Sequence, residues 1–509
     1  MINYSRRNSS VVKVGNLCIG GNNPIRIQSM LNTSTMDTEG SVNQAIDLIK
    51  AGSELVRLTT QGEREAKNMA LIREELNKRG YNTPLVADVH FNAKVADEAA
   101  LHVEKVRVNP GNYANSIDEI EQKFVPFLNL CKKHNTAIRL GVNHGSLNKR
   151  ILEKYGDTPQ GMTESCMEFL RICKRENFNN VIISVKASNT RIMVQTVRQM
   201  ARIMQKEDMN IPLHLGVTEA GDGEDGRIKS AVGIGTLLSD GLGDTIRVSL
   251  SESPVAEIPV AQRIVDFISK KSKAPKIEGS DENLYDPEHY SRRETVSVGE
   301  FGGNQVPLVL TAEETLLNGV LDCVLSSDNA LGEGRLFFAN LKSNNNKQPV
   351  ILTRFYDTSD VETLQIEASI ELGPFFIDGL ADGIRIVAPN IAPDIVNSLS
   401  YGILQATGAR MTKTEYISCP SCGRTLFDIE STIAKIKAAT SHLKSLKIGI
   451  MGCIVNGPGE MADADYGYVG AGVGRISLYR GQQCVEKNIP EDQAVEHLIA
   501  LIRSDGKWV

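Results

Sequence analysis

Short apolar runs with the composition of β-strands recur through the first half of the chain. Eight of them lie between residues 25 and 250, and each contains several Val, Ile or Leu residues. They span residues 25–30, 55–60, 85–90, 105–111, 137–143, 181–188, 213–220 and 245–250. We interpret these runs as strands because they are short, β-rich and separated by longer segments of different pattern.

The segments between most of these runs carry helical periodicity. In residues 41–52, four apolar side chains fall on one helical face and Gly52 follows as a stop. Eight strand–helix units in roughly 250 residues match a (β/α)8 barrel in count and length. We therefore predict an α/β fold whose first domain, residues 1–269, is a TIM barrel.

Polar and charged side chains lie in or just after the predicted strands. A TIM barrel builds its active site at the carboxyl ends of its strands, so these side chains are candidates for chemistry. They are Arg57, Asp88, His90, Arg107, Asn109, Arg139, Asn143, Ser184, Lys186, His214, Glu219, Arg247 and Ser249.

Four arginines and one lysine in this set come from five different strand ends, although the chain has a net charge of −6. Arg binds phosphate oxygens through a bidentate fork, so the convergence of these cations favours a phosphate-bearing substrate over solvated rim charges. The glycine-rich residues 221–235 could cradle a phosphate or form an ordinary loop. Neither a Walker A motif nor a strand-linked G-x-G-x-x-G fingerprint supports nucleotide binding.

The pattern changes after residue 269. Residues 270–300 are polar and charged, which is typical of a linker. Residues 305–405 contain further strand-like runs with helical stretches between them, and they show no dense cluster of catalytic residue types. We predict an inserted middle domain of mixed α/β structure over residues 270–410, with a structural or interaction role.

Composition narrows the class of protein. With 41% hydrophobic and 23% charged residues, the chain is typical of a globular protein and not of a disordered or collagen-like one. Its 62 acidic residues against 56 Lys and Arg argue against a dedicated nucleic-acid binder. We expect no membrane span and no secretory signal, because no apolar run reaches about 18 residues. Nine cysteines, most of them scattered, favour a reducing compartment, so we expect a cytoplasmic protein.

Three cysteines near the C-terminus form a pattern of their own. Cys419 and Cys422 make a C-x-x-C knuckle, in which Gly423 helps the turn, and Cys453 follows in the segment IGIMGCIVNGPGEM. The C-x-x-C spacing lets two thiolates bind one metal centre from a tight turn. We predict a metal site within a C-terminal α+β domain over residues 411–509.

The spacing favours a 4Fe-4S cluster over structural zinc. Zinc prefers four Cys or His ligands, and the fourth would be Cys484 or His442, neither of which lies in a second knuckle. A cluster can be held by three thiolates, and Glu460 at the end of NGPGE is a candidate for the remaining iron because a carboxylate is a harder ligand. The alternative for the cysteines is a reactive disulfide pair, and the alternative for Glu460 is a solvated acid in a loop. The cluster and the cationic mouth together favour reductive cleavage of a C–O bond in a phosphorylated substrate.

Nine motifs carry a resemblance to a known family. They are LVADVHF, VRVNPGN, IRLGVNHGSL, SVKAS, LHLGVTEAG, IKSAVGIG, DTIRVSL, CPSCGR and GCIVNGPGE. Over residues 10–265 and 411–480 the chain resembles the 4-hydroxy-3-methylbut-2-enyl diphosphate synthases of the non-mevalonate (MEP) isoprenoid pathway. The resemblance implies reductive ring opening of 2-C-methyl-D-erythritol 2,4-cyclodiphosphate, with a 4Fe-4S cluster as cofactor and ferredoxin or flavodoxin as electron donor.

The resemblance also implies roles for residues at matching positions. Cys419, Cys422 and Cys453 match the cluster thiolates, and Glu460 matches the fourth ligand. Glu219, Glu460 and Asp88 are the candidate catalytic residues. The positions that match diphosphate binding are Arg57, Arg107, Arg139, Asn143, Lys186, Arg247 and Ser249.

The segment at 270–410 resembles the three-domain form of this family. The presence of this segment leaves open whether the cluster domain closes on its own barrel or on the barrel of a partner in a homodimer. We expect the C-terminal domain to close over the barrel mouth when substrate binds, with residues 270–300 as the hinge. Two other readings stay open: a zinc-ribbon-bearing barrel enzyme acting on a sugar phosphate, and a non-enzymatic iron–sulfur redox sensor.

Overall fold

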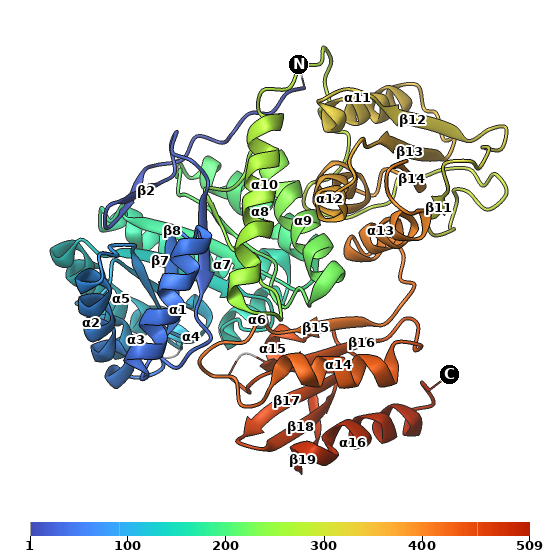
Figure 1. The fold of residues 1–509 in the computed structure, drawn as a ribbon. Helices are drawn as coiled ribbons and strands as arrows, with labels where there is room; N and C mark the ends of the chain where they lie inside the picture. The colour runs from blue at the N-terminus through green and yellow to red at the C-terminus, as the bar shows by residue number, and fades with distance from the viewer. Residues whose placement is uncertain (1, 91, 456, 509) are drawn as a thin grey trace.

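The computed structural model describes residues 2–90, 92–455 and 457–508. Phe91 of the LVADVHF motif and Asn456 of the GCIVNGPGE motif lie outside the described residues. A barrel, a middle sheet with its helices and a C-terminal sheet with its helices follow one another along the chain (Figure 1). Within the described residues, no helix combines the length and the apolar composition that crossing a membrane requires.

Eight parallel strands form the barrel, which confirms the predicted fold class. Their order in the sheet is β8-β7-β6-β5-β4-β3-β10-β9, and a parallel bridge between Ile183 and Leu213 brings the two ends together. The strands are β3 (Arg26–Met30), β4 (Leu55–Thr59), β5 (Leu85–Asp88), β6 (Lys105–Val108), β7 (Ala137–Asn143), β8 (Val181–Lys186), β9 (His214–Leu215) and β10 (Thr245–Ile246).

Helices surround the barrel on its outer side. They are α1 (Thr38–Ala51), α2 (Glu63–Lys78), α3 (Ala93–Ala99), α5 (Ile117–His134), α7 (Pro159–Arg175), α8 (Thr190–Lys206), α9 (Gly223–Ser239) and α10 (Glu257–Lys271), with short helices α4 (Pro110–Tyr113) and α6 (Lys149–Tyr155) in two loops. The predicted glycine stop is confirmed at α1. Gly52 has a φ of 114° and its N–H donates to the carbonyl oxygens of Leu48 and Ile49.

A small hairpin closes the end of the barrel opposite its mouth. It consists of β1 (Val12–Val14) and β2 (Leu17–Ile19), paired antiparallel. Its apolar side chains pack against Leu55, Val86 and Ala137 at the starts of the barrel strands. The carboxyl ends of the strands are therefore the end that remains for a functional site.

The middle region is a second, smaller parallel sheet. Its strands are β11 (Leu308–Leu310), β12 (Leu321–Leu325), β13 (Val350–Phe355) and β14 (Gly383–Val387), in the order β11-β14-β13-β12. Its helices are α11 (Ala330–Ser343), α12 (Val361–Ile377) and α13 (Pro393–Ala406). All its strand pairs are parallel, which agrees with strands that alternate with helices along the chain.

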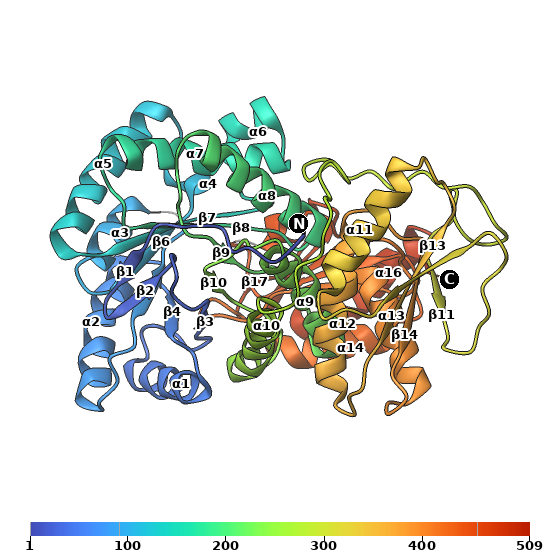
Figure 2. The same ribbon diagram turned by 90° about the horizontal axis from the view of Figure 1, so that it is seen from above.

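Helix α12 joins the middle region to the barrel by packing against α9 (Figure 2). Both helices are buried around most of their circumference, because each lies between its own sheet and the other helix. Two glycines allow the close approach. A Cβ at Gly235 would lie 2.5 Å from Ile370, and a Cβ at Gly373 would lie 3.1 Å from Val232.

The C-terminal region has the predicted α+β character. It contains β15 (Glu415–Ser418), β16 (Lys447–Met451), β17 (Tyr466–Gly472), β18 (Arg475–Arg480) and β19 (Gln483–Pro490), with α14 (Ile429–Thr440), α15 (Gly457–Glu460) and α16 (Glu491–Ser504). β15, β16 and β17 pair in parallel, and β17, β18 and β19 pair antiparallel. The loops after β15 and β16 face the barrel mouth (Figure 1).

A buried ion-pair network crosses the contact between barrel and middle region. Arg198 of α8 binds Asp240 at 2.8 Å and Asp378 at 2.6 Å, and Arg335 of α11 binds Asp240 at 2.6 Å. Each of these side chains is 12% exposed or less. A network of this kind stabilises the contact only while every charge keeps its partner.

We predict that Arg198→Met destabilises the protein by about 3–5 kcal/mol, because it leaves two buried carboxylates short of a cation. Arg202→Met is the matched control on the same helix, since Arg202 pairs with Glu288 at an exposed site and should change stability by less than about 1 kcal/mol. Chemical denaturation followed by circular dichroism measures both. Equal stability of the two variants would contradict this view of the contact.

Candidate active site at the barrel mouth

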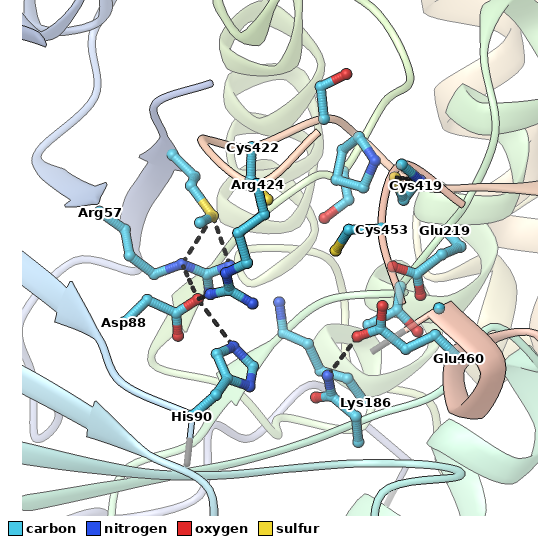
Figure 3. A pocket seen from close by; sticks show the side chains of 18 of the residues that line it. Arg57, Asp88, His90, Lys186, Glu219, Cys419, Cys422, Arg424, Cys453 and Glu460 are labelled. Atoms are coloured by element: carbon cyan, nitrogen blue, oxygen red, sulfur yellow. Dashed lines mark hydrogen bonds and ion pairs between the residues drawn. The ribbon is translucent and has the colours of Figure 1, made fainter. Parts of the chain in front are cut away.

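A cavity lies between the barrel mouth and the C-terminal region (Figure 3). Most candidate site residues from the sequence line it: Arg57, Asp88, His90, Arg107, Arg139, Asn143, Lys186, Glu219, Arg247, Ser249, Cys419, Cys422, Cys453 and Glu460. The other strand-end candidates, Asn109, Ser184 and His214, are buried but do not line it. The barrel residues come from seven different strands or the loops that follow them, and the cysteines come from the loops after β15 and β16. Side chains from the barrel and from the C-terminal region, which are far apart in the sequence, therefore line the same cavity.

The cations of the mouth are buried and are not solvated rim charges. Arg57, Arg107, Arg139, Lys186 and Arg247 are between 1% and 9% exposed. Strand register explains their proximity, because Arg107 on β6 pairs with Arg139 on β7 and Asn143 on β7 pairs with Lys186 on β8. Parallel strands in register carry these side chains to the same level of the barrel.

Two carboxylates compensate some of this charge. Asp88 lies 3.1 Å from Arg107 and 3.9 Å from Arg57, and Glu257 lies 3.2 Å from Arg247. Asp88 also contacts the ring of His90 at 3.1 Å. Burial, with Arg107 next in importance, lowers the pKa of His90 to about 3, so this ring is neutral.

The other cations lack such compensation. Among the described residues, Arg139 and Lys186 have no carboxylate within ion-pair distance, and Nε and Nη1 of Arg139 have no hydrogen-bond partner. Burial, and then Arg57 beside each of them, holds the pKa of Arg139 and of Lys186 well below its ordinary value. Buried cations without partners are costly, so the mouth is built for an anionic ligand.

Two glutamates approach one another where the domains meet. Glu219 follows β9 with a φ of 49°, in the left-handed region that few non-glycine residues adopt. Its Oε2 is buried and has no hydrogen-bond partner in the described part of the chain. Burial, followed by the nearby carboxylate of Glu460, raises the pKa of Glu219 well above its ordinary value. Across the domain boundary, the amide of Asn143 donates to Glu460 at 2.6 Å.

The cysteine knuckle contains a left-handed residue that the sequence did not predict. Ser421, between the two knuckle cysteines, adopts the left-handed conformation with a φ of 58°, and Gly423 does not. Gly423 permits close packing, because a Cβ there would lie 3.0 Å from the carbonyl oxygen of Thr33 on the barrel. Gly423 does lie in a turn, which the N–H of Thr425 closes by donating to the carbonyl oxygen of Cys422 at 2.9 Å, but its φ is not positive and its small size also serves the domain contact. The hydroxyl group of Thr425 also accepts from the N–H of Cys422 at 3.0 Å.

The donor set fits an iron–sulfur cluster better than a single zinc ion. Within the described ranges, no three His, Cys, Asp or Glu side chains are gathered as ligands of one metal ion. Three thiols and the Glu460 carboxylate nevertheless line one cavity, and a cluster binds its ligands through separate iron atoms that are farther apart. The two residues considered as a fourth zinc ligand lie elsewhere: His442 contacts Trp508 edge to face, and Cys484 lies on the outer strand β19.

Several lining residues were not assigned a role from the sequence. Those from the barrel are Met30, His90 and Thr218, and those from the C-terminal region are Pro420, Ser421, Arg424, Met451, Gly452 and Gly457. His90 stands among the polar strand ends, but nothing in its spacing points to a specific role. Arg424 directly follows the C-x-x-C-G motif, which places it beside the cysteines, yet its partner Asp88 lies 336 positions away along the chain. Local patterns do not reveal a pair of that separation.

The C-terminal region docks on the barrel of the same chain. Ala220 forms a parallel bridge with Ser418, and the hydroxyl groups of Ser251 and Ser418 lie 2.7 Å apart. Ion pairs surround this contact: Lys229–Glu415 at 2.6 Å, Lys413–Asp225 at 2.6 Å and Lys437–Asp222 at 2.5 Å. The glycine-rich residues 221–235 therefore contact protein, and none of them lines the cavity in the described structure. The arrangement is closed within one chain.

Two glycines allow a close approach between the barrel and the C-terminal region. A Cβ at Gly145, in the loop after β7, would lie 2.0 Å from the carbonyl oxygen of Gly459 beside Glu460. Gly145 also has a φ of 79°, so an alanine there is strained as well as obstructed. This contact sets how closely Glu460 can approach the mouth.

We predict that Gly145→Ala displaces the C-terminal region from the mouth. Gly156→Ala is the matched control, because Gly156 has a φ of 71° but its nearest neighbour for a new Cβ is a methyl group 3.4 Å away. Hydrogen–deuterium exchange of residues 415–424 should increase in the first variant and remain at the wild-type rate in the second. Identical exchange in the two variants would show that the glycine contact does not determine docking.

Comparisons with known proteins agree with this architecture. Residues 9–262 match the GcpE TIM-barrel domain, and residues 415–504 match the GcpE protein C-terminal domain. Proteins of Parabacteroides distasonis and Phocaeicola vulgatus are each 49% identical to the chain, over 100% of it and 99% of their own length. A protein of Leptospira interrogans is 39% identical, over 99% of the chain and 97% of its own length. All three bear the name 4-hydroxy-3-methylbut-2-en-1-yl diphosphate synthase (flavodoxin). The chain belongs to the GcpE family.

Proposed function

We propose that the chain is a 4-hydroxy-3-methylbut-2-en-1-yl diphosphate synthase of the MEP pathway. It converts 2-C-methyl-D-erythritol 2,4-cyclodiphosphate into 4-hydroxy-3-methylbut-2-enyl diphosphate and water. Two electrons and two protons enter, a C–O bond of the ring breaks, and one oxygen leaves as water. The observation that carries this proposal is one buried cavity that joins five cations to three thiols and a carboxylate.

The barrel mouth supplies the diphosphate site in this proposal. Arg139 and Lys186 are buried without a carboxylate partner in the described chain, so phosphate oxygens complete their hydrogen bonds and neutralise their charge. Arg57, Arg107 and Arg247 add charge around them. Ser249 and Asn143 offer neutral donors at the edge of the same site. The diphosphate is thereby oriented with its carbon skeleton toward the C-terminal region.

Cys419, Cys422 and Cys453 would hold a 4Fe-4S cluster, with Glu460 as the exchangeable ligand of the fourth iron. When bound, such a cluster supplies electrons one at a time and a Lewis-acidic iron. The printed name of the relatives includes flavodoxin, and we propose flavodoxin as the electron donor of this chain too. Because the cavity is lined by both domains of one chain, closure requires no second subunit.

Glu219 is the group placed to deliver a proton to the departing oxygen. Its Oε2 is buried and without a hydrogen-bond partner within the described residues, and it faces the cavity beside Glu460. Closure of the C-terminal region excludes bulk water from this point, which strengthens the cation–phosphate contacts. The two alternatives lose support: both candidates for a fourth zinc ligand, His442 and Cys484, lie outside the cavity, and a redox sensor does not need a buried cationic mouth.

We predict that Cys419→Ser, Cys422→Ser and Cys453→Ser lose the cluster, because a hydroxyl oxygen is too hard a donor to replace a thiolate. Cys484→Ser is the control, since Cys484 lies outside the cavity. Glu460→Ala should retain most of its iron and lose turnover. Iron and sulfide analysis of anaerobic protein measures the outcome. Full iron and a near-normal rate in any of the three cavity variants would end this assignment.

We predict that Lys186→Ala and Arg139→Ala each lower kcat/KM for the cyclodiphosphate by roughly ten- to hundredfold, because each removes a charge-assisted hydrogen bond to phosphate. Arg107→Ala and Arg247→Ala should lower it by a similar factor, although each also leaves a carboxylate short of its partner. The control is Lys206→Ala, at the exposed end of α8. Wild-type kinetics in all four cavity variants would show that the cations do not bind substrate.

A further inference from the structure

We propose that Arg424 is a positioning residue that couples anion binding in the barrel mouth to docking of the C-terminal region. This inference rests on the proposed function and extends it to a residue outside the candidate set. Arg424 lies on the C-terminal side of the cavity, two positions after Cys422. It reaches across the domain boundary toward Asp88 of the barrel (Figure 3).

The Arg424 side chain is held in a defined position. It is 5% exposed, and its Nη2 lies 3.3 Å from Oδ2 of Asp88. Asp88 already contacts Arg107, Arg57 and His90 on the barrel side. The negative charge of Asp88 is therefore already neutralised without Arg424. The Arg424–Asp88 pair connects the C-terminal region to a cluster of charges that the barrel forms by itself.

Docking adds another cation to a mouth that already contains too many. Arg424 acts electrostatically on both Arg57 and Arg107, and each of these interactions is repulsive. On its other side Arg424 faces Cys422, Cys453 and Glu460. Docking thus gives Arg424 one ion pair with the barrel, to Asp88, and this pair is opposed by the like charges of Arg57 and Arg107.

A polyanion in the mouth reverses this balance. The anion attracts Arg424 as well as the barrel cations. Its binding therefore stabilises the closed state, in which Arg424 is in place, more than an open state, in which Arg424 is absent from the mouth. The Nε of Arg424 is buried and has no hydrogen-bond partner in the described structure, which leaves a donor ready for an anionic acceptor. By linkage, an anion that favours docking must also bind more tightly to the docked protein.

The same geometry explains why the residue is an arginine. Its guanidinium can donate to Asp88 through Nη2 and still present Nε to a second acceptor, because the donors of the fork point in different directions. A lysine would preserve the charge but offers no such fixed fork. We therefore expect Arg424→Lys to keep part of the coupling and Arg424→Met to keep none.

The test uses anaerobic holoenzyme and inorganic pyrophosphate as the probe. Hydrogen–deuterium exchange of residues 415–424 and 457–460 is measured with and without the probe, and its affinity is measured by calorimetry. In the wild type, pyrophosphate should slow exchange in both segments. In Arg424→Met, this protection should be lost and the affinity should fall by roughly ten- to hundredfold. Arg424→Lys should show intermediate values, and KM for the cyclodiphosphate should rise more than kcat falls.

Two controls separate this coupling from a loss of structure. Arg480→Met removes an arginine of the same region that pairs with Asp505 at an exposed site, and it should behave as wild type. Iron and sulfide content should be unchanged in every Arg424 variant. Asp88→Asn combined with Arg424→Met should lose less than the sum of the two single effects.

The outcomes distinguish this proposal from the proposed function. A wild-type protein that turns over the cyclodiphosphate, with an Arg424→Met variant that keeps both pyrophosphate affinity and protection, would overturn the role of Arg424 and leave the enzyme assignment standing. Loss of the cluster in Arg424→Met would also overturn it, since the residue would then support the cysteine loop. A wild type without turnover would instead count against the proposed function.

Discussion

The rest of the structure depends on an excess of positive charge buried at the mouth of the barrel. Five cations are at least nine-tenths buried there, and the two carboxylates beside them, Asp88 and Glu257, pair with only three. Removing charges from water costs several kcal/mol per ion unless partners replace the water. The folded protein therefore holds an electrostatic strain that a polyanionic ligand would relieve, and in the proposed function this strain is the physical reason why the mouth takes a diphosphate.

The connection of the chain through the middle region places the C-terminal region over the cationic mouth of the barrel. Strand register carries the cations to one end of the barrel, and the hairpin β1–β2 closes the other end. The middle region packs on α9 and ends with α13, so it delivers the chain to β15 next to the loop after β9. Ser418 at the end of β15 then pairs with Ala220 in that loop. The cysteine loops, which follow β15 and β16, reach the mouth as a consequence.

Periodicity and spacing were sufficient to predict the barrel and most of the residues that line the cavity. The eight apolar runs marked the strands, and the rule that barrels work at their strand ends selected Arg107, Arg139 and Lys186. The C-x-x-C knuckle stood out against scattered cysteines. Each of these signals is local, because it depends on neighbours along the chain.

Features that depend on contacts between distant segments could not be predicted in this way. The pair of Arg424 and Asp88, the approach of Gly145 to Gly459 and the docking role of residues 221–235 all join different domains. The left-handed conformation of Ser421 inside the knuckle was also missed, because a serine gives no local signal for a positive φ. Tertiary packing fixes such details and leaves little trace in local composition.

The central claim is that one chain completes the site, with its own C-terminal region closed on its own barrel. Co-expression of Lys186→Ala chains with Cys453→Ser chains, followed by assay of the mixed anaerobic protein for cyclodiphosphate turnover, tests it directly. One variant has a defective barrel and the other a defective cluster region. If closure occurs within a chain, every site has one defective half, and activity should not exceed the sum of the two variants alone. Restoration of turnover in the mixture would show that the cluster region of one chain serves the barrel of another, which would contradict this account.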